Sequence, residues 1–136
     1  FDLYREWTTS IYCPDAADTF PLDAYDYVLD CIDSIAHKAL LIRRATASTA
    51  TLFSSMGAAR KMDPARVRVA EFWQVEGCPL AAALRKRFRR AKEFPAKKFR
   101  CVYSDELIHA EGAMVHVTAT FGFTLAGLVL QNIIKS

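Results

Sequence analysis

The segment Tyr25–Ile42, with the sequence YDYVLDCIDSIAHKALLI, constrains the fold of this chain most strongly. Tyr27–Leu29 is a short apolar run of strand-favouring residues, and a polar stretch follows it at once. From Ser34 onward apolar residues recur at helical spacing, and either Asp33 or Ser34 is a suitable N-cap. We therefore predict a buried strand that leads directly into a helix, with Asp30 and Asp33 at the junction.

A second short apolar run, Ala50–Phe53, follows the predicted helix, which ends near Ala47. Two strands joined by a helix of this length form a right-handed parallel unit, so the pattern predicts an α/β fold with a mostly parallel sheet flanked by helices. Ligands of such sheets bind at the carboxyl ends of the strands. Asp30 and Asp33 would lie there, where a carboxylate can hold a magnesium ion on a nucleotide. The alternative is that Asp33 only caps the helix.

The loop Ser54–Ala59 consists mainly of small residues and follows the second predicted strand. Small side chains let a substrate approach the backbone, and Gly57 can adopt a positive φ. An ordinary turn is the alternative interpretation. Arg60 and Lys61 come next and are candidates to face phosphate, although basic residues beside a turn usually only contact water.

Further elements are predicted along the chain. Strand patterns occur at Leu3–Ile11, Val67–Phe72 and Phe99–Tyr103, a helical turn at Asp15–Asp18, and a helix from Leu80 to about Ala91.

Cys78 precedes the helix that begins at Leu80, where backbone N–H groups favour a thiolate. It is the candidate reactive thiol among four cysteines, although a buried packing role is the alternative. No cysteine pair has metal-ligand spacing, which argues against structural zinc and favours free thiols in a reducing cytosol.

The segment Arg85–Arg100 is strongly basic, with nine basic residues and one acidic residue, whereas the whole chain carries a net charge of +3. The candidate phosphate-binding residues in it are Arg85, Lys86, Arg87, Arg89, Arg90, Lys97 and Lys98. Such a patch attracts nucleic acid through counterion release. Phe88, Phe94 and Phe99 are interleaved with it and could stack on unpaired bases. The alternative is that they belong to the core and that the charges only solubilise a helix.

The segment from Met114 to Ile134 is apolar almost all round and predicts the last helix. A membrane span needs about 20 apolar residues, and several polar residues interrupt this one. We prefer a core or dimer-interface helix in which Gly122 and Gly127 permit close packing. His116 is expected to be a structural histidine with a hydrogen-bond partner.

Several stretches together resemble one enzyme family. They are, in order, the DYVxDxIDS…K…LI pattern of Tyr25–Ile42, Ser54–Ala59, Met62–Pro64, Arg66–Val69, Pro79–Ala82 with Leu84–Arg85, Cys101–Ser104 and Val117–Phe123. This ordered set resembles the adenylating enzymes related to ubiquitin-activating enzymes, the ThiF/MoeB/HesA family, and most of all the tRNA threonylcarbamoyladenosine dehydratases. Family members begin with a strand and a glycine-rich GxGGVG turn, which residues 1–136 do not contain, so the chain looks like the C-terminal part.

The resemblance implies an ATP- and Mg²⁺-dependent enzyme with a Rossmann-like fold, the end of the nucleotide-binding half in residues 1–60 and a substrate or dimerisation half in residues 61–136. The implied nucleotide-site residues are Asp30, Asp33, Ser34, Ser55 and Gly57, with Mg²⁺ on Asp33 and Asp30 in support. Arg60, Lys61 and the segment Arg85–Arg100 would hold tRNA.

The same resemblance implies a cytoplasmic homodimer. One alternative is an adenylyltransferase for a sulfur-carrier protein that uses Cys78, with a carrier or a cysteine desulfurase as partner. Another is a non-catalytic fragment that binds RNA or dimerises.

Overall fold

A computed structural model of the chain describes residues 10–13, 15, 18–107 and 111–135. In this structure β1 (Tyr27–Asp30) leads into α1 (Ile35–Ala47), and β2 (Thr51–Ser55) pairs with β1 in parallel. The strand–helix–strand unit predicted from the sequence is therefore confirmed. The strand predicted at Leu3–Ile11 and the turn predicted at Asp15–Asp18 fall largely outside the described residues.

The remaining strands complete a four-stranded sheet in the order β1-β2-β4-β3. β4 (Arg100–Ser104) pairs with β2 in parallel, and β3 (Val67–Glu71) pairs with β4 in antiparallel orientation. The sheet is thus mostly parallel, as predicted. The carboxyl ends of β1, β2 and β4 form one edge, which we call the carboxyl edge, and the end of β3 lies at the opposite, amino edge.

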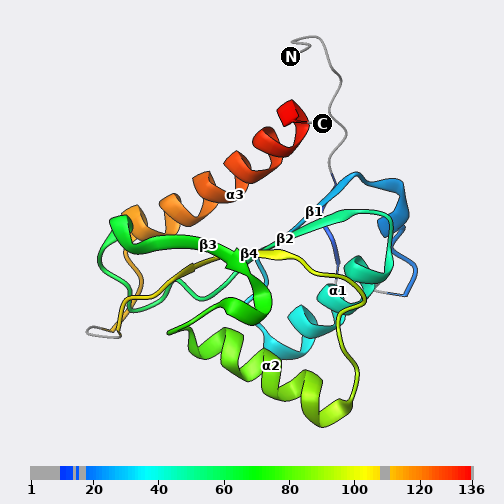
Figure 1. Ribbon diagram of the computed structural model, residues 1–136, viewed down its shortest axis with the longest axis horizontal. Helices are drawn as coiled ribbons and strands as arrows, with labels where there is room; N and C mark the ends of the chain where they lie inside the picture. The colour runs from blue at the N-terminus through cyan, green and yellow to red at the C-terminus, as the bar shows by residue number, and fades with distance from the viewer. Residues whose placement is uncertain (1–9, 14, 16–17, 108–110, 136) are drawn as a thin grey trace.

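Helices cover both faces of the sheet. α1 and α2 (Pro79–Ala91) lie on one face, and α3 (Val115–Lys135) crosses the other (Figure 1). Because side chains alternate along a strand, neighbouring residues serve different cores. Leu52 and Cys101 pack in the core beneath α1 and α2, whereas Phe53 and Val102 pack in the core beneath α3. Within residues 18–107, the short 3₁₀ helices Leu22–Ala24, Pro64–Arg66 and Phe72–Gln74 occupy connections.

α3 packs on the sheet through its most buried side chains, Val117, Phe121, Leu125, Leu128 and Val129. It is also long and apolar enough to cross a bilayer by length and composition, with a mean hydropathy of 1.6, but one such helix is weak evidence for a membrane span. Gly122 and Gly127 do not serve close packing in the described structure, because a Cβ added at either would meet no neighbouring atom within 4 Å. His116 Nε2 lies 3.0 Å from the Met62 carbonyl oxygen, which fits a structural histidine.

Two glycines provide a matched test of the backbone. Gly77 has a φ of +68°, and a Cβ there would lie 3.2 Å from the Asp105 carbonyl oxygen, whereas Gly122 lies inside α3 with open space around it. We expect Gly77→Ala to destabilise the fold by about 1–2 kcal/mol, because a left-handed backbone disfavours a Cβ. Gly122→Ala should instead stabilise it by about 0.5–1 kcal/mol, since alanine is the better helix former. Urea unfolding of both variants measures these changes, and equal midpoints would refute the assignment of strain to Gly77.

Candidate functional site

At the end of β1, Asp30 is fully buried and both of its carboxylate oxygens have partners inside the fold. Its Oδ1 accepts from the Ile32 backbone N–H at 3.0 Å, and its Oδ2 accepts from the Ser54 hydroxyl at 2.6 Å. Lys38 forms an ion pair with the same Oδ2 at 2.8 Å. Asp30 therefore cannot contact a nucleotide directly, and its prediction as a cofactor-binding residue is wrong. Its position agrees with the other role predicted for it, that of supporting Asp33.

Lys38 connects three segments at the carboxyl edge. It lies in the first turns of α1 with 0% of its surface exposed, and besides Asp30 its ammonium donates to the Ile32 carbonyl at 2.9 Å and to the Ser55 carbonyl at 2.7 Å. All three of its N–H donors therefore have acceptors. The Asp30–Lys38 pair thus fixes the ends of β1 and β2 relative to the start of α1, on either side of the loop that carries Asp33.

Asp33 differs from Asp30 in being exposed, and its side chain has no hydrogen bond or ion pair with the described part of the chain. Ser34 holds the N-cap position of α1, but its side chain makes no capping bond either. The interpretation of Asp33 as only a helix cap is therefore not supported. A carboxylate without a protein partner, in front of a helix N-terminus at the carboxyl edge, is open to a ligand from solvent.

The loop after β2 lies at the same edge. The Met56 N–H donates to the Val102 carbonyl at 2.8 Å, and Gly57 lies beside Leu80 in the first turn of α2, which a Cβ on Gly57 would approach to 3.7 Å. Ser55 and Gly57 are both half-buried. This arrangement agrees with a loop whose backbone a substrate can approach.

A cation at this edge would depend on few protein ligands. Among the described residues, no group of three or more His, Cys, Asp or Glu side chains could hold a metal ion. Mg²⁺ usually takes one or two carboxylates and completes its shell with waters and substrate phosphates. Asp33 fits that mode of binding, whereas it could not by itself hold Zn²⁺.

Lys61 lies beneath the surface, and the prediction that it contacts phosphate is wrong. Only 1% of it is exposed, and its ammonium donates to the carbonyls of Gly77 at 3.4 Å, Ser104 at 3.2 Å and Glu106. It joins the loops that follow β2 and β4. Arg60, in contrast, is exposed and adopts a positive φ of 64°.

The basic segment divides into inward and outward residues. Arg85 donates from Nη1 to the carbonyls of Phe72 and Val75 at 3.0 and 2.9 Å, and Lys97 donates to the carbonyls of Ser48 and Ala50. These two cations stabilise the fold. The other five candidate phosphate-binding residues, which we call the basic surface, are exposed: Lys86, Arg87, Arg89, Arg90 and Lys98.

The phenylalanines of this segment divide in the same way. Phe88 and Phe99 are 1% and 4% exposed and belong to the core, so they are not available to stack on bases. Phe94 is 54% exposed. A groove of about 740 Å³ lies between α1 and α2, lined among others by His37, Arg43, Lys86, Arg87 and Arg90.

The four cysteines differ in accessibility. Cys78 is 4% exposed and its Sγ accepts from the Ala81 N–H at 3.5 Å, so the expectation that it is the most reactive thiol is wrong. Burial raises the pKa of Cys101 above its ordinary range. Cys13 and Cys31 are exposed. The pKa of Cys31 is nevertheless raised, mainly because its thiol is partly shielded from water and to a smaller extent because of the negative charge of Asp30.

We expect a thiol reagent such as Ellman's reagent at pH 8 to titrate two cysteines in the native chain and all four in guanidinium chloride. Because the pKa of Cys31 is raised, the rate at which it reacts with the reagent should still increase above pH 9, where an ordinary thiol is mostly ionised. Cys13→Ser should remove one of the two accessible thiols, and Cys78→Ser should remove neither. Rapid labelling of Cys78 in the native chain would overturn this assignment.

Two residues of this description had no role assigned from the sequence: Lys38 and Trp73. A signal existed for Lys38, because it shares the helical face of Leu41, Ile42 and Ala45, all of which are buried. A lysine on the apolar face of a helix, soon after an aspartate that ends a strand, indicates a buried ion pair. No comparable signal identified Trp73.

No protein-family model matches the chain. Among curated proteins it is similar to tRNA threonylcarbamoyladenosine dehydratases. That of Bacillus subtilis is 37% identical over 81 residues, which cover 60% of this chain and 31% of the relative. That of Haemophilus influenzae is 29% identical over 134 residues, which cover 82% and 51%. The chain thus spans between about a third and about half of these relatives.

The structure agrees with solved structures of the same enzyme. Crystal structures of the Escherichia coli dehydratase in complex with AMP and with ATP superpose with a TM-score of 0.79 at 30% identity, over 93% of this chain and 55% of theirs. HcgE from Methanothermobacter marburgensis, bound to ATP and guanylylpyridinol, shares the fold at 21% identity with a TM-score of 0.60.

Proposed function

We infer that this chain, a homologue of the tRNA threonylcarbamoyladenosine dehydratases over about half of their length, forms one side of a site in which ATP activates a modified adenosine of tRNA. The carboxylate of threonylcarbamoyladenosine would attack the α-phosphorus of ATP and release pyrophosphate. An atom of the same threonylcarbamoyl group would then attack the activated acyl carbon, and AMP would leave. The nucleoside would thus lose one water overall. The single observation that carries this proposal is the structural match to the E. coli enzyme with ATP bound.

Asp33 is the residue of this chain best placed to hold a magnesium ion on the nucleotide, because it is exposed at the carboxyl edge and has no protein partner among the described residues. Mg²⁺ bound there would offset the charge of the phosphates. Lys38 and Asp30 would act as positioning residues, since they hold the strand ends on both sides of Asp33 without being exposed themselves. Ser34, Ser55 and Gly57 would border the nucleotide through their backbone.

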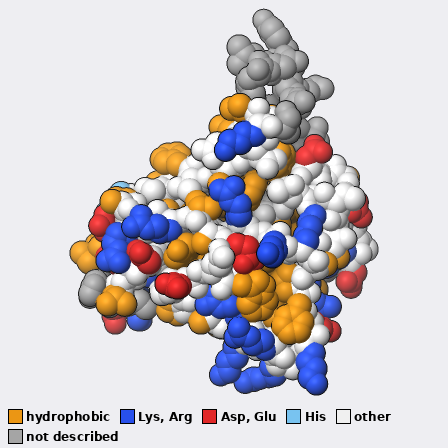
Figure 2. Space-filling model, viewed as in Figure 1, with side chains coloured by type: hydrophobic (Ala, Val, Ile, Leu, Met, Phe, Trp, Pro, Cys, Tyr) orange, Lys and Arg blue, Asp and Glu red, His pale blue; other side chains and the backbone are white. Residues whose placement is uncertain are grey.

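The basic surface and Arg60 are proposed to attract the tRNA. Lys86, Arg87, Arg89, Arg90 and Lys98 are all exposed and carry five positive charges within 13 residues of sequence. Figure 2 shows Lys and Arg side chains gathered around the lower part of the molecule, where α2 lies. Arg85, Lys97 and Lys61 are excluded from this surface by their internal hydrogen bonds.

A sulfur-carrier adenylyltransferase is the less favoured function, because it should present a competent thiol and Cys78 is buried. The proposed homodimer has separate support. Phe123 and Ile134 of α3 are 76% and 67% exposed, and Leu130, between them in sequence, is 42% exposed, so this helix offers apolar surface to a second copy of the chain.

Release of AMP tests the function. The chain, extended at its N-terminus until a glycine-rich turn is included, should release AMP from ATP with tRNA that carries threonylcarbamoyladenosine, and much less with unmodified transcript. The conversion should remove one water from the nucleoside, which mass spectrometry detects. AMP release with a sulfur-carrier protein and none with the modified tRNA would overturn the proposal.

A further inference from the structure

Trp73 and Phe94 form an exposed aromatic pair that no element of the described fold covers. Trp73 is 38% exposed and Phe94 is 54% exposed, with ring centroids 6.2 Å apart and planes tilted by 46°. The buried Phe72 meets Trp73 edge-on at 5.1 Å and so supports it from the core. The pair is therefore a firm apolar surface built on the hydrophobic core.

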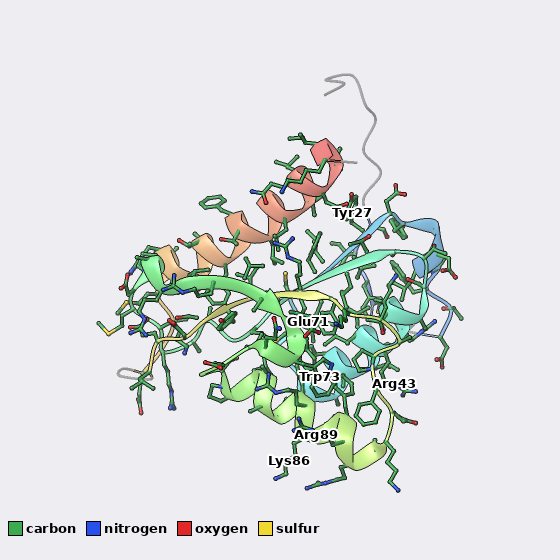
Figure 3. All side chains as sticks on the ribbon, viewed as in Figure 1. Tyr27, Arg43, Glu71, Trp73, Lys86 and Arg89 are labelled. Atoms are coloured by element: carbon green, nitrogen blue, oxygen red, sulfur yellow. The ribbon has the colours of Figure 1, made fainter. Side chains whose placement is uncertain are left out.

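Cations lie on the helix beside this aromatic pair. The Arg89 guanidinium carbon lies 5.4 Å from the centroid of the Trp73 ring, and Lys86 is exposed on the same helix. Figure 3 shows Trp73 below the end of β3, with Arg89 and Lys86 further down on α2. Two acidic groups lie nearby. Glu71 accepts from the Trp73 N–H at 3.0 Å through Oε2, while its buried Oε1 has no hydrogen-bond partner among the described residues, and Glu93 pairs with Arg43 at 2.7 Å.

The location connects this surface to the proposed catalytic edge. Trp73 follows the end of β3 and lies at the amino edge, opposite Asp33. The groove between α1 and α2 runs from Ile35, two residues after Asp33, to Arg90 and Glu93, next to Phe94. A polyanion that follows this groove would pass Lys86 and Arg90 along its length.

We propose that the aromatic pair stacks on unpaired bases of an RNA loop while Lys86, Arg89 and Arg90 contact its phosphates. This inference rests on the proposed function in naming RNA as the ligand. Exposed aromatic rings framed by exposed cations suit single-stranded RNA, whose bases stack on aromatic side chains and whose backbone is anionic. An acidic protein would use the cations but would leave the rings without a role.

Direct contact is tested by fluorescence. The chain has two tryptophans, so in a Trp7→Phe background Trp73 is the only one. A 17-nucleotide RNA hairpin with a seven-nucleotide loop should quench its emission, because a stacked base quenches an indole. A duplex RNA of the same length should quench it much less. Unchanged emission at saturating hairpin, with binding verified by anisotropy, would overturn the proposal.

Affinity gives the second test. Trp73→Leu/Phe94→Leu keeps apolar bulk but removes both rings, and we expect it to bind the labelled hairpin roughly 5- to 100-fold more weakly. Val115→Ala, which shortens an exposed apolar side chain of α3 across the sheet, is the control and should bind as the parent does. Thermal unfolding verifies that each variant is folded. Equal affinity of the double variant and the parent would refute base stacking.

The salt dependence of RNA affinity distinguishes the contribution of the aromatic rings from that of the basic residues. Each phosphate contact contributes about 0.7 to the slope of log affinity against log salt for single strands. The double aromatic variant should keep the parent slope, whereas Lys86→Ala/Arg90→Ala should lower it by about 1.4. If the double aromatic variant binds the hairpin as the parent does, and the parent releases AMP with modified tRNA, only this inference fails and the proposed function stands. Binding of an acidic carrier protein with no binding of RNA would count against both.

Discussion

Replacing Lys38 with methionine is expected to lower the free energy of unfolding by about 3–5 kcal/mol. The substitution preserves the bulk of the side chain but leaves the Asp30 carboxylate, which has 0% exposure, without its cation. It also leaves the Ile32 and Ser55 carbonyls without the donors at 2.9 and 2.7 Å. Urea unfolding followed by circular dichroism measures the change.

Two variants control this result. Lys86→Met makes the same substitution at an exposed position of α2 and should change stability by no more than about 0.5 kcal/mol. Asp30→Asn/Lys38→Met removes the uncompensated charge and should be more stable than Lys38→Met alone. A loss below about 1 kcal/mol for Lys38→Met would mean that the buried pair does not stabilise the junction of β1, β2 and α1.

The second large effect is a loss of activity that leaves the stability of the fold unchanged. Asp33→Ala is expected to reduce tRNA-dependent AMP release by about a hundredfold or more, because a preorganised group that offsets developing charge typically contributes that much. Its stability should stay within about 0.5 kcal/mol of the parent, since the side chain is exposed and has no partner in the described structure. Magnesium titration of AMP release should show a raised requirement for the ion in Asp33→Glu.

Asp26→Ala is the matched control for this prediction. Asp26 is an exposed aspartate immediately before β1, at the opposite end of the strand from Asp33, so its removal changes the net charge equally. It should retain full activity. Equal loss in both variants would indicate a general effect of charge on tRNA binding, not a site at Asp33.

The local elements could be predicted from the sequence because their signals are local. The change from a strand pattern at Tyr27–Leu29 to helical spacing after Ser34 places β1 and α1 almost where they lie. The helix after Pro79 likewise follows from a proline at its first position and a periodic apolar face. Strand order and the antiparallel orientation of β3 depend on long-range pairing and had no such signal.

The charged residues were harder to interpret, because composition does not show where a long side chain ends. Lys38, Lys61, Arg85 and Lys97 donate to backbone carbonyls within the fold, whereas Lys86 and Arg90 reach solvent. For Phe88 a signal existed, since it lies four residues after Leu84 on the buried face of α2. Trp73 and Phe94 come from separate connections, so only the tertiary structure brings them together.

The most direct test of the central claim, that this chain contributes the metal-binding carboxylate of an adenylating site, is ATP–pyrophosphate exchange stimulated by modified tRNA. The assay compares the N-terminally extended chain with its Asp33→Ala and Asp26→Ala variants. The account predicts exchange in the parent and in Asp26→Ala, and its near-complete loss in Asp33→Ala with tRNA binding retained. Exchange that persists in Asp33→Ala, or its absence from a folded parent that binds ATP and tRNA, would contradict it.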